Sequence, residues 1–277
     1  MHGTFRATEI KPTRDRRKDI ELRPHRANHG LTVAYNEKLE RMVRDMQKSV
    51  VYWIAATYRN NEPIMAMDDA LPANALKRAI AELTKRWQKQ FDQAAPDLAE
   101  WFAKAAHTRS DAQLRSILRK GGFSVKFQMT PAMRDILKAT IEQNISLIKS
   151  IPEQYLKNVQ GHVMRSIQAG RDLGTLTKAL QKNYGVTRRR AAFIARSQNN
   201  LATGAMNKAR QEELGIVKAK WRHSKAGKHK RPTHVANDGK LYDVKTGWYD
   251  PEVKRFIFPG ELPNCKCSSI SVIPGFS

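Results

Sequence analysis

Apolar residues recur every three or four positions over most of this chain between residues 31 and 215, and this spacing constrains the fold more than any other feature. Such a period places the apolar side chains on one face of a helix. Over residues 31–58, for example, Leu39, Val43 and Met46 share one face. The sequence therefore predicts a body of amphipathic helices.

Proline, glycine and capping residues divide this region into successive helices. Pro72 suits the first turn of a helix that ends at Pro96, and Pro152 suits the start of another. Gly170 and Gly185 are each expected to end a helix, because glycine favours the position after a last turn. The helices are predicted over residues 31–58, 72–95, 98–105, 110–120, 131–148, 152–167, 173–184 and 187–214.

The pattern changes after Gly215, where glycine, proline, aspartate and asparagine occur every few residues. The apolar residues there are aromatic or β-branched, which favours short strands joined by turns. The expected strands cover residues 217–222, 240–244 and 255–258, and the alternating segment 123–129 is a further candidate. The predicted class is α+β: a basic arm over 1–30, a mainly helical domain over 31–215, and a small α+β or β-rich module over 216–277.

The charge of the chain indicates an anionic partner. Lysine and arginine number 50 against 26 aspartates and glutamates, which leaves a formal net charge of +24. Such an excess repels itself unless a polyanion lies nearby, and nucleic acid is the first candidate. Residues 50–56 form the longest strongly apolar stretch, far below the roughly 18 residues that a membrane span needs, and residues 1–30 lack the apolar core of a signal peptide. We therefore expect neither a membrane partner nor secretion.

The most basic segment, residues 221–234, contains three histidines and five cations without an acidic residue. Lysine and arginine side chains contact DNA phosphates independently of base sequence. The alternative is a solvated basic loop that has no ligand. The residues predicted to bind DNA are Arg222, Lys225, Lys228, Lys230 and Arg231.

Both cysteines of the chain lie in one short motif, Cys265-Lys266-Cys267. A disulfide between residues two apart would be strained, whereas thiolates are soft ligands that favour zinc. His229 and His234 complete a Cys2His2 donor set, and His223 is a spare nitrogen ligand. The predicted cofactor is therefore zinc, held by His229, His234, Cys265 and Cys267. The alternative is a pair of plain buried thiols.

A metal-dependent nuclease is the alternative function. His234 and Asp238 could activate water or hold a catalytic metal beside a phosphodiester. However, the module has few carboxylates, and Asp238-Gly239 is first of all a turn sequence. The sequence contains neither a nucleophile elbow nor a phosphate-binding glycine loop. We therefore expect a protein that is not an enzyme, with no catalytic residues.

Several short segments of the carboxyl-terminal region, taken together in their order and spacing, resemble the phage Mu F-like minor head protein family, a group of phage head-morphogenesis and minor capsid proteins. The segments that carry the resemblance are 194–198, 214–216, 221–224, 231–234, 238–240, 258–260 and 264–267. The resemblance covers residues from about 170 to 277. Many members carry an aspartate-led segment before the arginine and histidine, whereas this chain has the more basic Gly227–Arg231, which weakens any inference of catalysis.

The resemblance implies a structural component of a tailed-phage virion that acts in procapsid assembly, DNA packaging or ejection. The implied partners are the portal protein, the packaged double-stranded DNA and a major capsid or scaffold protein. The implied location is the phage head near the portal vertex, and the host cytoplasm during assembly.

Overall fold

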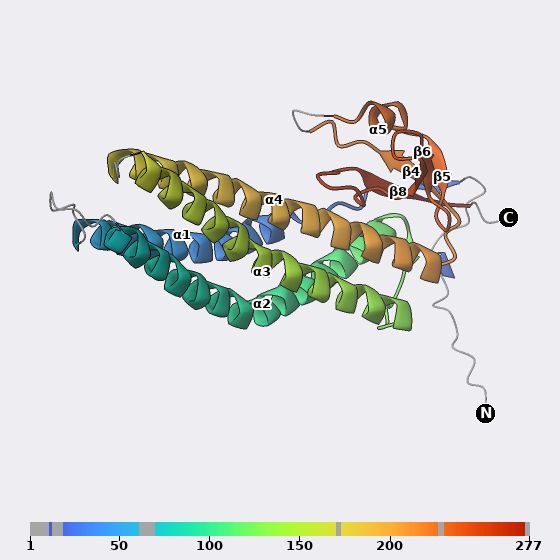
Figure 1. Ribbon diagram of the computed structural model, residues 1–277. Helices are drawn as coiled ribbons and strands as arrows, with labels where there is room; N and C mark the ends of the chain where they lie inside the picture. Colours follow the sequence, from blue (N-terminus) through green and yellow to red (C-terminus); the bar gives the residue numbers. More distant parts are fainter. Residues whose placement is uncertain (1–10, 13–18, 61–69, 170–172, 227–229, 275–277) are drawn as a thin grey trace. The chain divides into compact units, whose positions relative to one another are not determined.

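The computed structural model describes residues 11–12, 19–60, 70–169, 173–226 and 230–274. Four long helices precede a carboxyl-terminal set of short strands (Figure 1). The helices are α1 (His29–Asn60), α2 (Ala70–Lys120), α3 (Pro131–Gln168) and α4 (Leu173–Glu213). Among the helices of the described residues, none combines the length and apolar character that a membrane crossing requires.

The helices are fewer and longer than predicted. Pro96 lies inside α2, Pro152 inside α3, and Gly185 inside α4, so the breaks predicted at these residues are wrong. A proline inside a helix removes one backbone hydrogen bond, and a glycine adds conformational entropy to the unfolded chain. Both costs are local. The apolar stripe continues past them, since Ala95 and Ala99 on either side of Pro96 are fully buried, and burial along the stripe keeps each helix continuous.

The chain divides into two compact units, each built from several segments. One unit contains residues 33–100 and 141–195, and the other contains residues 1–32, 101–140 and 196–277. The domain boundaries predicted at residues 30 and 215 differ from the limits of these two units. They stay predictions.

The first unit has an apolar core with a few buried polar bonds. Val43, Met46 and Val50 of α1 are fully buried there, as the helical period predicts. The Tyr58 hydroxyl donates to Ser166 Oγ at 2.8 Å, and Tyr155 bonds Gln47. These bonds satisfy hydroxyl groups that would otherwise be costly to bury.

The second unit contains a four-stranded antiparallel sheet in the order β2-β8-β4-β5. Its strands are β2 (Ile20–Glu21), β4 (Lys218–Arg222), β5 (Leu241–Asp243) and β8 (Ser268–Ile273). Two pairs complete the strands of the described residues: β1 (Lys11–Pro12) with β3 (Phe123–Ser124), and β6 (Trp248–Asp250) with β7 (Arg255–Ile257). Helix α5 (Pro232–Ala236) is a short turn between β4 and β5.

The α+β class is confirmed, and three of the predicted strands are present as β4, β5 and β7. The candidate strand at 123–129 is a strand only at Phe123–Ser124. The sequence analysis missed β8, which is one of the two inner strands and pairs with both β2 and β4. Strand β8 is buried on both faces, yet three of its six residues are serines, so it does not have the continuous apolar run that is typical of such a strand.

Residues 19–28 of the predicted basic arm are ordered against β8. Ile20 pairs with Ile273, and the His25 amide donates to the Ser269 carbonyl at 3.1 Å. The second unit therefore joins the amino-terminal arm to the carboxyl-terminal sheet.

Candidate functional site: a cation-lined pocket and a cysteine–histidine cluster

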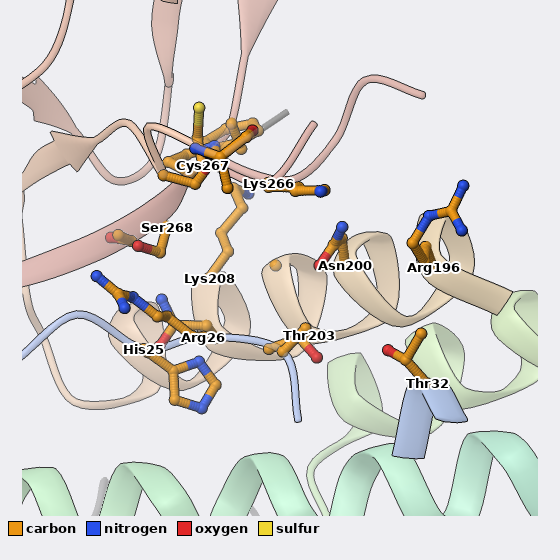
Figure 2. Close-up of a pocket in the computed structure, with 18 of the residues that line it drawn as sticks. His25, Arg26, Thr32, Arg196, Asn200, Thr203, Lys208, Lys266, Cys267 and Ser268 are labelled. Carbon is orange, nitrogen blue, oxygen red and sulfur yellow. Dashed lines mark hydrogen bonds between the residues drawn. The ribbon is translucent and has the colours of Figure 1, made fainter. Parts of the chain in front are cut away.

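A pocket of about 340 Å³ lies within the second unit, where three distant segments meet. The amino-terminal arm and the first turn of α1 contribute residues between 25 and 32. Helix α4 contributes residues between 196 and 211, and the carboxyl-terminal module contributes residues between 224 and 269. Figure 2 shows the side chains of Arg26, Lys208 and Lys266 around the same space. The pocket therefore depends on the tertiary fold rather than on any one motif.

The pocket is strongly cationic. Arg26, Arg196, Lys208 and Lys266 line it, and none of the described residues that line it is an aspartate or glutamate. Arg26, Arg196 and Lys266 are exposed, so their charges reach solvent. Lys208 lies over the Phe258 ring at 4.6 Å and also pairs with Glu212 at 3.0 Å, outside the lining. The charge of this pocket suits an anion.

Two buried side chains of the pocket have polar atoms without a partner among the described residues: His25 Nδ1 and Asn207 Oδ1. His25 is 5% exposed and its Nε2 lies 3.1 Å from the Ser110 carbonyl. Burial lowers the pKa of His25 to about 4, against the opposing effects of that hydrogen bond and of Asp111, so the ring is neutral at pH 7. If Nε2 donates to Ser110, Nδ1 is left as an acceptor. Both atoms are therefore available to a donor on a ligand.

A second site, the cysteine–histidine cluster, consists of His234, Cys265 and Cys267. The Nδ1 atom of His234 lies 3.5 Å from Cys265 Sγ and 3.6 Å from Cys267 Sγ. Its Nε2 atom lies 3.2 Å from Asp250 Oδ2. All four residues are buried. The structure thus brings together His234, Cys265 and Cys267, three of the four residues predicted to hold zinc, and the metal itself stays a prediction.

Local structure positions each member of the cluster. His234 lies on α5, which begins with Pro232. The Cys265 amide donates to the Leu262 carbonyl at 2.9 Å in a turn that holds Asn264 at a φ of 61°, and Cys267 directly precedes β8. Asp250 ends β6. Helix α5, the turn that precedes β8 and the end of β6 thus bring the His234 imidazole, the two sulfurs and the Asp250 carboxylate together.

The two cysteines shift each other's pKa in opposite directions. The hydrogen bond from Cys267 lowers the pKa of Cys265, and the same bond together with burial raises the pKa of Cys267. Trp221 and Trp248 pack edge-on against the His234 ring at centroid distances of 5.0 and 6.1 Å. Two tryptophan rings therefore border the His234 side of the cluster.

The residues predicted to bind DNA are arranged unevenly. Lys225 and Lys230 are exposed, whereas Arg222 lies 3.7 Å from Asp238 and Arg231 donates to the Pro263 carbonyl at 3.0 Å. Lys228 lies outside the described residues, as does His229, the predicted fourth metal ligand. Lys225 and Lys230 are therefore accessible to a ligand, whereas Arg222 and Arg231 have contacts within the module.

The residues of the nuclease alternative have structural contacts. The Asp238 carboxylate accepts the His223 amide at 3.0 Å, which fits the interpretation of this residue as part of a turn. Asp238 does not join the group of ligand atoms around His234 among the described residues.

Sequence reasoning missed the pocket altogether. Arg26, Arg196 and Lys266 are unremarkable cations in the sequence, and no spacing rule connects positions so far apart. The one signal that pointed in this direction was the net charge of the whole chain. In contrast, the Cys-x-Cys motif was a local signal, and its chemistry led to His234, 31 positions before Cys265, as a further candidate ligand.

Comparison with known proteins supports the resemblance found in the sequence. Residues 157–270 match the family described as phage Mu protein F like protein. The chain is also 27% identical over 261 residues to an uncharacterized protein of Haemophilus influenzae strain Rd, an alignment that covers 91% of this chain and 56% of that protein. The chain thus spans little more than half the length of this relative. No solved structure matches the chain.

Proposed function

On the premise that residues 157–270 are similar to phage Mu protein F, we propose that the chain is a head-morphogenesis protein of a tailed bacteriophage that contacts packaged DNA. Its role is structural, in procapsid assembly, DNA packaging or ejection. The observation that carries the DNA contact is the pocket in which Arg26, Arg196, Lys208 and Lys266 converge.

Phosphate recognition is the chemistry that this pocket suits. Charge-assisted hydrogen bonds from arginine and lysine to phosphate oxygens are stronger than neutral ones, and they position a protein on DNA without reading its bases. A head protein works beside densely packed polyanion, where a net charge of +24 is balanced rather than costly. Lys225 and Lys230 extend the cationic surface of the same unit.

The salt dependence of DNA binding tests this proposal. Each phosphate contact contributes a slope of about −0.9 to the plot of log Kobs against log salt. The double variant Arg196→Gln/Lys266→Gln is expected to make the slope shallower by about 2. The matched control is Lys85→Gln/Lys89→Gln, which removes the same charge from exposed positions on α2. If both double variants bind duplex DNA with the same slope, the pocket does not contact phosphate.

The portal protein is the proposed protein partner, with a major capsid or scaffold protein as a further one, and the head near the portal vertex is the proposed location. These proposals rest on the family alone. Co-expression with the portal is expected to yield a complex, and mass spectrometry is expected to find the chain in purified particles. If the chain fails to co-assemble and deletion of residues 218–277 leaves DNA retention by mature heads unchanged, the proposal fails.

The proposed role needs no catalysis. Plasmid incubated with the protein and a range of divalent metals is expected to stay intact. Cleavage that His234→Ala abolishes would favour the nuclease alternative instead.

A further inference from the structure

The two nitrogen-to-sulfur distances of the cysteine–histidine cluster match those of a tetrahedral metal site, and its three ligand atoms all lie within 4.8 Å of one another. Zinc binds sulfur at about 2.3 Å and histidine nitrogen at about 2.0 to 2.1 Å, so the sulfur-to-nitrogen edge of a tetrahedral site is about 3.6 Å. The two corresponding distances in this chain, from His234 Nδ1 to the two sulfurs, are 3.5 and 3.6 Å. We propose that His234 Nδ1, Cys265 Sγ and Cys267 Sγ bind one zinc ion.

The surroundings of His234 present the ring as a ligand. Its Nε2 atom faces the Asp250 carboxylate, which is fully buried, and donating a proton there leaves the Nδ1 lone pair directed at the sulfurs. A carboxylate behind a ligating histidine fixes its tautomer and increases its basicity. The hydrogen bond to Asp250 is therefore a positioning contact for the metal ligand.

The donor set selects the class of metal. Two thiolates and one imidazole favour zinc over magnesium or calcium, which prefer oxygen ligands. Both sulfurs would bind the ion as thiolates, so metal binding would release their protons. The alternative of two plain buried thiols does not account for the imidazole held between both sulfurs and a carboxylate.

The described residues supply three ligands, and the fourth position of a tetrahedral ion belongs to water or another donor. Cys267 also lines the cationic pocket, but Figure 2 shows its sulfur directed away from Arg26, Thr203 and Ser268. The inference is therefore independent of the proposed contact with DNA.

Zinc at this position would join three parts of the carboxyl-terminal module: α5 through His234, the 264–267 turn, and β6 through Asp250. Strands β5, β6 and β7 have only three residues each, so their backbone pairing alone offers little stability. Metal binding contributes directly to the folding free energy of such a module.

The first experiment measures metal in the full-length protein, purified under reducing conditions without chelator. Elemental analysis is expected to give one equivalent of zinc per chain, and X-ray absorption is expected to show two sulfur neighbours at about 2.3 Å. Replacement by CoCl2 is expected to give a thiolate-to-cobalt charge-transfer band. Less than about a tenth of an equivalent of zinc, with no such band after CoCl2 is added to the folded protein, overturns the proposal.

Variants test which residues hold the ion. Cys265→Ser, Cys267→Ser and His234→Ala are each expected to lose most of the zinc, whereas the control His223→Gln, a buried histidine of the same module, is expected to keep it. Full zinc content in the three ligand variants overturns the assignment.

A second measurement on the wild type covers the case in which a ligand variant fails to fold. Removing zinc with a chelator is expected to lower the Tm, and adding ZnCl2 is expected to restore it. An unchanged Tm after zinc has been removed completely would mean that the ion does not bind this buried cluster, and so would contradict the proposal.

Discussion

Arg210 shows how one buried charge depends on its partners. The side chain is 1% exposed, and its guanidinium donates to Asp111 at 3.0 and 2.7 Å and to Glu213 at 2.5 Å. Because Arg210→Ala leaves the buried Asp111 without its counter-ion, we expect a loss of about 3 to 5 kcal/mol in the free energy of unfolding, measured in urea. The control Arg188→Ala removes an exposed arginine paired with Glu40 and should cost less than about 1 kcal/mol. Equal losses would contradict this account.

His25 gives the protein a pH-dependent stability. Its pKa is lowered from 6.5 in the unfolded chain to about 4 in the folded one, chiefly by burial. Between these values the unfolded chain binds more protons, so stability falls as the pH falls from about 6.5 to about 4, by up to roughly 3 kcal/mol from this residue. We expect His25→Gln to remove that part of the loss in urea titrations at pH 7 and pH 5. A variant with the wild-type pH dependence would show that His25 is not the group responsible.

Two glycines of α4 should respond to alanine in opposite ways. A Cβ at Gly204 would lie 2.6 Å from the Pro259 carbonyl oxygen, so Gly204→Ala must displace the backbone that lines the pocket. We expect it to destabilise the protein by about 1 to 3 kcal/mol and to weaken DNA binding. At Gly185 the nearest atom is the flexible end of Arg189 at 3.6 Å, and Gly185→Ala should stabilise the continuous helix by about 0.5 to 1 kcal/mol.

The comparison of the two variants also tests the continuity of α4, because the sequence predicts a break at Gly185. Thermal unfolding measures both effects. If Gly185→Ala destabilised the protein instead, a helix end at that glycine, as the sequence pattern indicates, would be the better description.

At the scale of the whole molecule, the net charge of +24 leads us to expect that a polyanion stabilises the folded chain. A ligand that binds only the folded chain stabilises it by about 2.7 kcal/mol at a hundred times its Kd. Short duplex DNA at low salt is therefore expected to raise the Tm, and the rise should disappear in about 1 M NaCl, where the Debye length is about 3 Å. The protein without DNA over the same salt series is the control. A Tm that DNA leaves unchanged at low salt would argue against a working state bound to nucleic acid.

Local patterns in the sequence predicted the helical body, the turn-rich module and part of the cysteine–histidine cluster. Helical periodicity gave the helical body, the turn-rich composition after Gly215 gave a small module with strands, and the Cys-x-Cys motif with His234 gave three members of one cluster. The helix period, the turn chemistry and the Cys-x-Cys spacing depend on neighbours within a few residues, whereas His234 lies 31 positions before Cys265.

The helix ends, strand β8, the position of Asp250 and the cationic pocket depend on long-range packing instead. Whether Pro96, Pro152 and Gly185 end a helix depends on the burial of the stripe on either side of them, and burial is a property of the packed chain. Strand β8 is buried on both faces although three of its six residues are serines, and Asp250 lies behind His234 through a strand end sixteen positions away. The pocket brings Arg26, Arg196 and Lys266 together from segments that meet only when the arm pairs with the sheet beside α4. Long-range contacts of this kind leave no periodic trace in a sequence, because each residue's partner is set by topology rather than by spacing.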